Sequence, residues 1–179
     1  MTSLRITAGA LRGRRVSVPP RDVRPTAERA RQAFFNIVGQ RIDGARFLDL
    51  FAGSGIFSFE AVSRGAAAAT AVDRERRNVE TIDRMAKEWN VPVKALAGEV
   101  TSVLPRVGET FDIVYADPPY DYAGYDELLQ AIDRLSLAPN ALVAIEHRRR
   151  SDPFRRYDGR LRPARRAEYG EVWITLFAA

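Results

Sequence analysis

The sequence predicts an α/β fold, in which helices cover both faces of a mostly parallel sheet. Short apolar runs alternate with helical repeats from residue 46 to residue 146, and this alternation is typical of parallel strands joined by crossover helices. Two of these runs end in turns whose residues are suited to binding or catalysis, Gly53-Ser54-Gly55 and Asp117-Pro118-Pro119-Tyr120. A length of 179 residues is sufficient for one domain with a complete core.

Residues 1–40 are expected to form an extension that packs on a globular unit of residues 41–179. Residues 4–7 and 12–18 have the composition of two short strands, and Pro19-Pro20 would end the second one. This pattern predicts a β-hairpin. A two-stranded hairpin is marginally stable alone, so this one must pack on the core.

A helix is expected after the hairpin, because apolar residues recur there at helical spacing. Thr26 is suited to be its N-cap, and Gly39 can end it. Arg29 and Arg31 are expected to lie on the outer side of this helix.

The alternating region is expected to contain five strands, over residues 47–50, 67–72, 91–96, 111–116 and 141–146. Helices are expected over residues 56–64, 79–89 and 125–135. The chain ends differently, because residues 162–169 and 171–177 flank Gly170 in the pattern of an antiparallel hairpin.

Positive charge is concentrated towards the two ends of the chain, although the net charge is only +5. Residues 1–31 have a net charge of +6 and residues 147–166 of +7, whereas residues 32–146 have −6. Basic ends around an acidic centre indicate a rim that binds a polyanion such as nucleic acid. The alternative is that an arginine-rich composition reflects genome bias or thermal adaptation.

Composition also argues against several classes of protein. The chain has no cysteine and His147 is its one histidine, so neither a thiolate site nor a histidine cluster for a metal is expected. No apolar run approaches the roughly 20 residues of a membrane span, and the N-terminus lacks the apolar core of a signal peptide. We therefore expect a cytoplasmic protein without a metal, and we expect a monomer.

The glycine-rich turn predicts a nucleoside site. Ser58 stands where the dinucleotide fingerprint has its third glycine, and the turn contains no lysine, which argues against a dinucleotide site and excludes a P-loop. Asp73 follows Gly55 by 18 residues, about the spacing at which a carboxylate binds both ribose hydroxyls. Glu99, at the end of the third strand, can border the adenine. The alternative is an ordinary strand-to-helix turn with surface acids.

The tetrapeptide Asp117-Pro118-Pro119-Tyr120 predicts chemistry on an exocyclic amine. Two prolines fix the backbone and remove two N–H donors, so Asp117 and a backbone carbonyl are presented rigidly. Both can accept hydrogen bonds from an NH2 group and localise a lone pair that the base ring otherwise delocalises. Tyr120 provides a flat face on which a base can stack. The alternative is a turn that only ends a strand.

These motifs, Asp49 to Gly55 and Asp117 to Tyr120, resemble those of the class I S-adenosylmethionine-dependent amino-methyltransferases. A set of N-terminal residues narrows the resemblance to the bacterial guanine-N2 methyltransferases of 16S ribosomal RNA: Arg5-Ile6, Gly9, Arg12-Gly13-Arg14, Arg24-Pro25-Thr26, Arg29 and Phe35-Asn36. The resemblance covers nearly the whole chain and implies a Rossmann-like sheet of seven strands whose last two form a hairpin. The sequence departs from the family at Ser58, where glycine is frequent, and residues 56–59 are bulkier than usual.

The resemblance also implies roles for individual residues. S-adenosylmethionine would be bound by Thr26, Asp49, Phe51, Ala52, Gly53, Ser54, Gly55, Asp73, Arg74, Glu99, Val100 and Asp117. Catalysis would rest on Asp117, Pro118, Pro119 and Tyr120. Ribosomal RNA of the small subunit would be bound by Arg5, Arg12, Arg14, Arg15, Arg24, Arg29, Arg148 and Arg149.

Three other functions stay open at this point. Adenine-N6 methylation of DNA or RNA uses the same tetrapeptide chemistry, but it would usually need an added recognition domain, for which 179 residues leave little room. Methylation of a protein glutamine amide is the second, although an asparagine in place of Asp117 is its usual form. The third is a non-enzymatic RNA-binding or assembly module.

Overall fold

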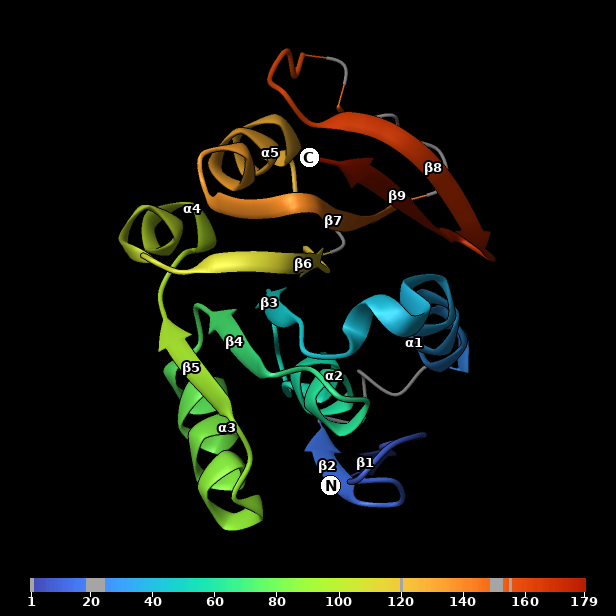
Figure 1. Ribbon diagram of the computed structural model, residues 1–179, viewed down its shortest axis with the longest axis vertical. Coiled ribbons are helices and arrows are strands. Elements are labelled where there is room, and N and C mark those ends of the chain that lie inside the picture. Colours follow the sequence, from blue (N-terminus) through green and yellow to red (C-terminus); the bar gives the residue numbers. More distant parts are fainter. Residues whose placement is uncertain (1, 19–24, 120, 149–152, 155) are drawn as a thin grey trace.

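The architecture is a seven-stranded sheet with helices on both faces (Figure 1). A computed structural model describes residues 2–18, 25–119, 121–148, 153–154 and 156–179. The strands are β3 (Arg46–Leu50), β4 (Ala68–Asp73), β5 (Val93–Ala97), β6 (Thr110–Ala116), β7 (Ser136–Arg148), β8 (Arg162–Tyr169) and β9 (Val172–Ala178). Their order is β5-β4-β3-β6-β7-β9-β8, parallel from β5 to β7 and antiparallel in β9 and β8. The predicted α/β class and the C-terminal hairpin are confirmed.

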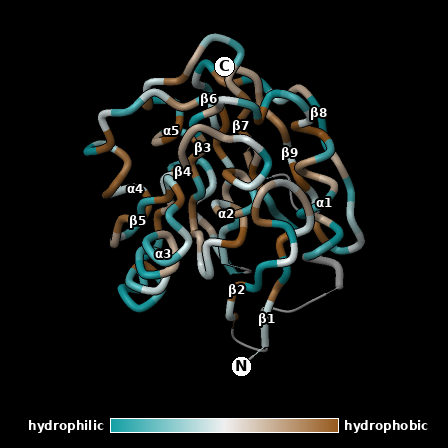
Figure 2. The backbone as a smooth tube through the Cα atoms, turned by 60° about the horizontal axis from the view of Figure 1, so that its bottom comes forward, coloured by the Kyte–Doolittle hydropathy of each residue, from teal (hydrophilic) through white to brown (hydrophobic). Residues whose placement is uncertain are grey.

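The helices are α1 (Pro25–Val38), α2 (Ile56–Ser63), α3 (Arg76–Trp89), α4 (Val100–Val103) and α5 (Tyr125–Asp133), with 3-10 turns at Gly39–Ile42 and Leu104–Arg106. Alternate side chains of a strand point to opposite faces. Phe47 of β3 therefore packs with α1, α2 and α3, whereas its neighbour Leu48 packs with α4 and α5. Figure 2 shows hydrophobic residues concentrated along the central strands and hydrophilic residues along much of α3. No helix among the described residues is long and apolar enough to cross a membrane.

The observed elements differ from the expected ones most at the start of β7 and at three short helical segments. Strand β7 starts at Ser136, five residues before the expected position, because Ser136 and Leu137 pair with the beginning of β6 ahead of a register shift. The short α4 and the two 3-10 turns have no counterpart in the sequence prediction. Turns of three or four residues are too short to show a helical repeat.

The N-terminal extension packs on the outer side of α2. Strands β1 (Thr2–Arg5) and β2 (Arg15–Val18) form the predicted antiparallel hairpin, which Figure 1 shows beside α2. Thr7 donates its N–H and its hydroxyl to the fully buried carboxylate of Glu60. Gly9, at φ +80°, lies so close to α2 that a Cβ there would be 1.6 Å from the Ser63 carbonyl oxygen. These contacts fix the extension against the core.

Two expectations about α1 are wrong. Thr26 is not the N-cap, because the helix starts at Pro25, and proline suits the first helical position, where no N–H is needed. Arg31 does not lie on the outer side, since only 2% of it is exposed. Its guanidinium donates to the Arg5 carbonyl at 3.0 Å, and its Nε lies 3.9 Å from the Glu60 carboxylate. The hairpin and α2 thus supply partners that make burial of this charge tolerable.

Candidate active site

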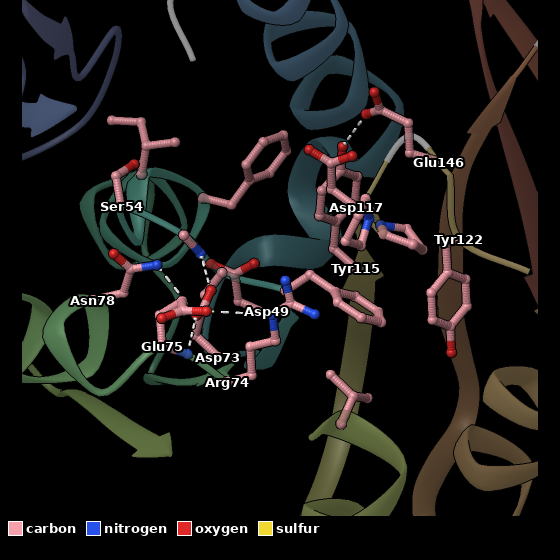
Figure 3. Close-up of a pocket in the computed structure, with 18 of the residues that line it drawn as sticks. Asp49, Ser54, Asp73, Arg74, Glu75, Asn78, Tyr115, Asp117, Tyr122 and Glu146 are labelled. Atoms are coloured by element: carbon pink, nitrogen blue, oxygen red, sulfur yellow. Dashed lines mark hydrogen bonds and ion pairs between the residues drawn. The ribbon is translucent and has the colours of Figure 1, made fainter. Parts of the chain in front are cut away.

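The predicted site residues meet at the carboxyl ends of the parallel strands. A pocket with a volume of about 650 Å³ lies there, and Figure 3 shows part of its lining. Of the expected residues, the lining includes Asp49, Phe51, Ala52, Gly53, Ser54, Asp73, Arg74, Glu99, Val100, Asp117, Pro118, Pro119 and Arg148. Gly55 is not part of the lining; its φ is +74°, and a Cβ there would lie 2.8 Å from the Ile82 side chain, so a larger residue would not fit. Tyr120 and the side chain of Thr26 lie outside the described residues.

The glycine turn is tied to the end of the next strand. The Gly53 N–H donates to Asp73 Oδ2 at 2.7 Å. Asp73 Oδ1 accepts from the Glu75 N–H at 2.8 Å and from the Asn78 side chain at 3.1 Å. These bonds hold the carboxylate in one orientation, and a carboxylate has about four acceptor positions in all, so capacity for a further donor is left. The arrangement suits one further donor, such as a hydroxyl of ribose.

Asp49 lies beneath the turn and is only 2% exposed. Its Oδ2 accepts from the Ser58 N–H at 3.0 Å and from the Ser58 hydroxyl at 2.7 Å. Burial raises the pKa of Asp49 to about 7, although the two bonds from Ser58 act in the opposite direction. Ser58, the residue at which the sequence departs from the family pattern, therefore satisfies a buried carboxylate.

The raised pKa predicts that stability falls as pH rises. Between the ordinary value of 3.8 and about 7, the folded protein holds a proton on Asp49 that the unfolded chain has released. Each pKa unit corresponds to about 1.4 kcal/mol, so the loss should amount to a few kcal/mol. We expect Asp49→Asn, which can still accept from Ser58, to flatten this dependence. The free energy of unfolding by urea, determined across this pH window, measures the dependence. Parallel curves for the variant and the wild type would contradict a raised pKa of Asp49 as its cause.

The Asp117 turn follows β6 directly. The Asp117 N–H donates to the Leu50 carbonyl at 3.2 Å, so the turn is tethered to β3, while its side chain is exposed. Tyr122 stands five residues after Asp117 and lines the pocket, although the sequence prediction did not include it. Its ring packs edge-on against Phe51, with ring centroids 5.3 Å apart. The half-buried ring of Tyr122 therefore lies in the same pocket as the Asp117 turn.

Glu146 and Tyr115 are the main site residues that the sequence prediction missed. The Tyr115 hydroxyl donates to Glu146 Oε2 at 2.6 Å. Phe57 stacks on the Tyr115 ring, with centroids 4.0 Å apart and planes 14° from parallel. Burial raises the pKa of Glu146, an effect that the hydrogen bond from Tyr115 opposes. The available signal was a carboxylate directly after an apolar run, residues 141–145, much as Asp117 follows the apolar residues at the end of β6.

The expected RNA-binding arginines lie on several elements, from the N-terminal hairpin to the carboxyl edge of the sheet. Those that the structure describes are all exposed: Arg5, Arg12, Arg14 and Arg15 on or near the hairpin, Arg29 on α1 and Arg148 at the end of β7. Arg24 and Arg149 lie outside the described residues. Arg14 stacks over Trp89 of α3 at 5.2 Å from the ring centroid. Within the described part of the chain, no cluster of three or more acidic or histidine side chains could hold a metal ion.

Comparisons with known proteins agree with this architecture. The model of the family "Conserved hypothetical protein 95" matches residues 4–178. Ribosomal RNA small subunit methyltransferase D of Escherichia coli K12 is 34% identical over 146 residues, which are 80% of this chain and 74% of that protein. YlbH of Bacillus subtilis, a proposed rRNA methyltransferase, is 29% identical over 97% of this chain and 98% of its own.

The solved structure of yhhF from Escherichia coli, a proposed methyltransferase, superposes with a TM-score of 0.85. It is 28% identical and the match covers 99% of this chain and 98% of that one. The chain therefore belongs to the family of ribosomal RNA small subunit methyltransferase D, and it has the class I, Rossmann-like fold of S-adenosylmethionine-dependent methyltransferases.

Proposed function

We propose that the protein transfers a methyl group from S-adenosylmethionine to the exocyclic N2 of a guanine in 16S ribosomal RNA of the small subunit. One observation carries this proposal: the glycine turn with Asp73, and the Asp117-Pro118-Pro119 turn, line a single pocket. The first set suits a nucleoside and the second an amine. The methyl donor and the amine that accepts the methyl group would therefore meet inside this pocket. The names of the relatives support ribosomal RNA as the substrate.

The left part of the pocket in Figure 3 would hold the cofactor. S-adenosylmethionine supplies a methyl group on a positively charged sulfur, which is an electrophile. Gly53, at φ +54° and without a side chain, lets a ligand approach the backbone closely. Asp73 would accept from a ribose hydroxyl, and Glu99 would border the adenine. The buried carboxylate of Asp49 suits a ligand that carries positive charge.

The opposite part of the pocket would hold the base. A guanine amine can reach this site only after the base has left its stack in RNA. Asp117 and the Pro118 carbonyl would accept the two amine hydrogens and so direct the nitrogen lone pair towards the methyl group. Tyr120 would stack on the ring, as the sequence predicts. Alignment inside a pocket that excludes water is the main source of rate enhancement in this mechanism.

Methyl transfer with a radiolabelled donor tests the proposal against its rivals. The acceptors are small subunits from cells that lack the protein, naked DNA, and a protein extract. We expect label in the RNA of the small subunits and in no other acceptor. Label in DNA or protein would favour adenine-N6 or glutamine methylation. Cofactor binding without label in any acceptor would favour a non-enzymatic RNA-binding module.

We further propose that residues 1–40 bind RNA beside a catalytic unit of residues 41–179. The protein would act as a cytoplasmic monomer. Arg12→Gln should weaken binding to small-subunit RNA about three- to tenfold and reduce the slope of log affinity against log salt by about 1. Arg84→Gln, an equal charge change on the exposed side of α3, is the control. Filter-binding titrations at several salt concentrations measure both. Equal slopes for the two variants would contradict a phosphate contact by Arg12.

A further inference from the structure

Two carboxylates lie at the carboxyl ends of neighbouring strands, in the base-binding part of the pocket: Asp117 directly after β6 and Glu146 near the end of β7. Ala116 of β6 pairs with Ile145 of β7 in parallel register, which places the next residues, Asp117 and Glu146, side by side. Both line the pocket, and Figure 3 shows them together with Tyr115 on one side of it. The mechanism proposed above uses Asp117 and leaves Glu146 without a role.

The carboxylate of Glu146 is oriented by its neighbour. Tyr115 donates to Oε2, and it is the hydrogen-bond partner that the described residues provide for this side chain. The Tyr115 ring itself packs against Phe57 and Phe34, with centroids 4.0 and 4.6 Å away. One oxygen is therefore engaged by the protein, and Oε1 is left to accept a hydrogen bond from a ligand in the pocket. Such a fixed acceptor is costly to bury unless a ligand donor meets it.

The chemistry of the bases identifies that donor. Among the four RNA bases, only guanine carries an exocyclic amine directly beside a ring N–H. Adenine and cytosine have an amine next to a ring nitrogen that accepts hydrogen bonds, so a carboxylate there would face a lone pair. Two adjacent carboxylates thus match the N2 amine and the N1–H of guanine, and they repel the other amine-bearing bases.

We infer that Glu146 accepts the N1–H of the target guanine and makes the site specific for guanine. This inference rests on the proposed function, because it assigns the base recognition of the same site. Asp117 would engage the amine, and Glu146 would read the neighbouring ring position. Tyr115 is a positioning residue that holds the carboxylate towards the base.

A base analogue placed in the RNA tests whether Glu146 accepts a hydrogen bond from N1–H. 2,6-Diaminopurine retains the 2-amino group of guanine but has an accepting N1 without a hydrogen. After the methylated position is mapped, small subunits are reconstituted with 16S RNA that carries either guanine or 2,6-diaminopurine at that position. The wild-type protein should methylate the guanine form about 10- to 100-fold faster, since the other base places a lone pair against Glu146.

Glu146→Gln should change this preference and not only the rate. Its amide oxygen can still accept from Tyr115, and its NH2 group then faces the base, where it opposes the N1–H of guanine and matches N1 of 2,6-diaminopurine. We expect the rate on guanine to fall about tenfold or more, and the ratio of the two rates to shift by about 10- to 100-fold towards 2,6-diaminopurine. Glu146→Ala, which removes both oxygens, should bring the ratio of the rates on guanine and 2,6-diaminopurine close to one. This variant replaces Glu146→Gln in the test if Glu146→Gln folds poorly.

Two further variants separate recognition from structure. Tyr115→Phe keeps the carboxylate and should retain the preference for guanine at a lower rate. Glu80→Gln makes the same chemical change on the exposed side of α3 and should alter neither rate. If Glu146→Gln and Glu146→Ala lower both rates equally, Glu146 is only structural and the inference is overturned. If the wild-type protein methylates neither kind of subunit, the proposed function fails, and the inference fails with it.

Discussion

Asp117→Ala is expected to abolish methyl transfer while S-adenosylmethionine still binds. In the proposed mechanism the Asp117 carboxylate accepts a hydrogen bond from the attacking amine and has no part in binding the ribose or the adenine. Loss of one preorganised electrostatic contact in an active site typically costs about 10²- to 10³-fold in rate. The backbone tether from the Asp117 N–H to the Leu50 carbonyl does not involve the side chain, so the turn should persist.

The measurement combines cofactor binding by calorimetry with single-turnover transfer to small subunits. Asp121→Ala is the matched control, since Asp121 is an exposed aspartate in the same turn region that does not line the pocket. We expect this control to turn over at the wild-type rate. Wild-type turnover by Asp117→Ala would exclude the carboxylate from the mechanism.

Asp73→Ala should cause the largest loss of cofactor affinity. A hydrogen bond to a charged group contributes about 1.5–3 kcal/mol, so removal of a carboxylate that accepts from a ribose hydroxyl should weaken binding about 10- to 100-fold. The substitution also leaves the Gly53 N–H and the Asn78 side chain without their acceptor, which should loosen the glycine turn. Affinity for S-adenosylhomocysteine, measured by calorimetry beside a thermal unfolding curve, separates the two effects.

Asn78→Ala provides the control for this prediction. It removes one bond to Asp73 Oδ1 but keeps the carboxylate and its bond to Gly53. We expect a loss of affinity that is about tenfold smaller than for Asp73→Ala. If Asp73→Ala folds and binds the cofactor as tightly as the wild type, the ribose is bound elsewhere.

Features that depend on local sequence were predicted well. The alternation of strands and helices, the glycine turn after β3 and the Asp117 turn after β6 can each be recognised within about ten residues. Their meeting in one pocket follows from topology, because parallel strands place their carboxyl ends at the same edge of a sheet. No atomic geometry was needed for that step.

Features that depend on contacts between distant segments were missed or predicted wrongly. The sequence predicts that Arg31 lies at the surface, but the Arg5 carbonyl and the Glu60 carboxylate both lie next to its guanidinium. Glu146 and Tyr115 are separated by 31 residues and meet through the register of β6 and β7. The role of Ser58 required the position of Asp49, nine residues earlier, to be known. Helical and strand periodicity contain none of these relations.

Mass spectrometry of nucleosides tests the central claim most directly. Small subunits from cells that lack the protein are incubated with it and with a deuterium-labelled methyl donor, and their RNA is then digested to nucleosides. The proposed function predicts labelled N2-methylguanosine as the product, with none formed by Asp117→Ala. Labelled N6-methyladenosine, or an absence of labelled nucleosides despite bound cofactor, would contradict it.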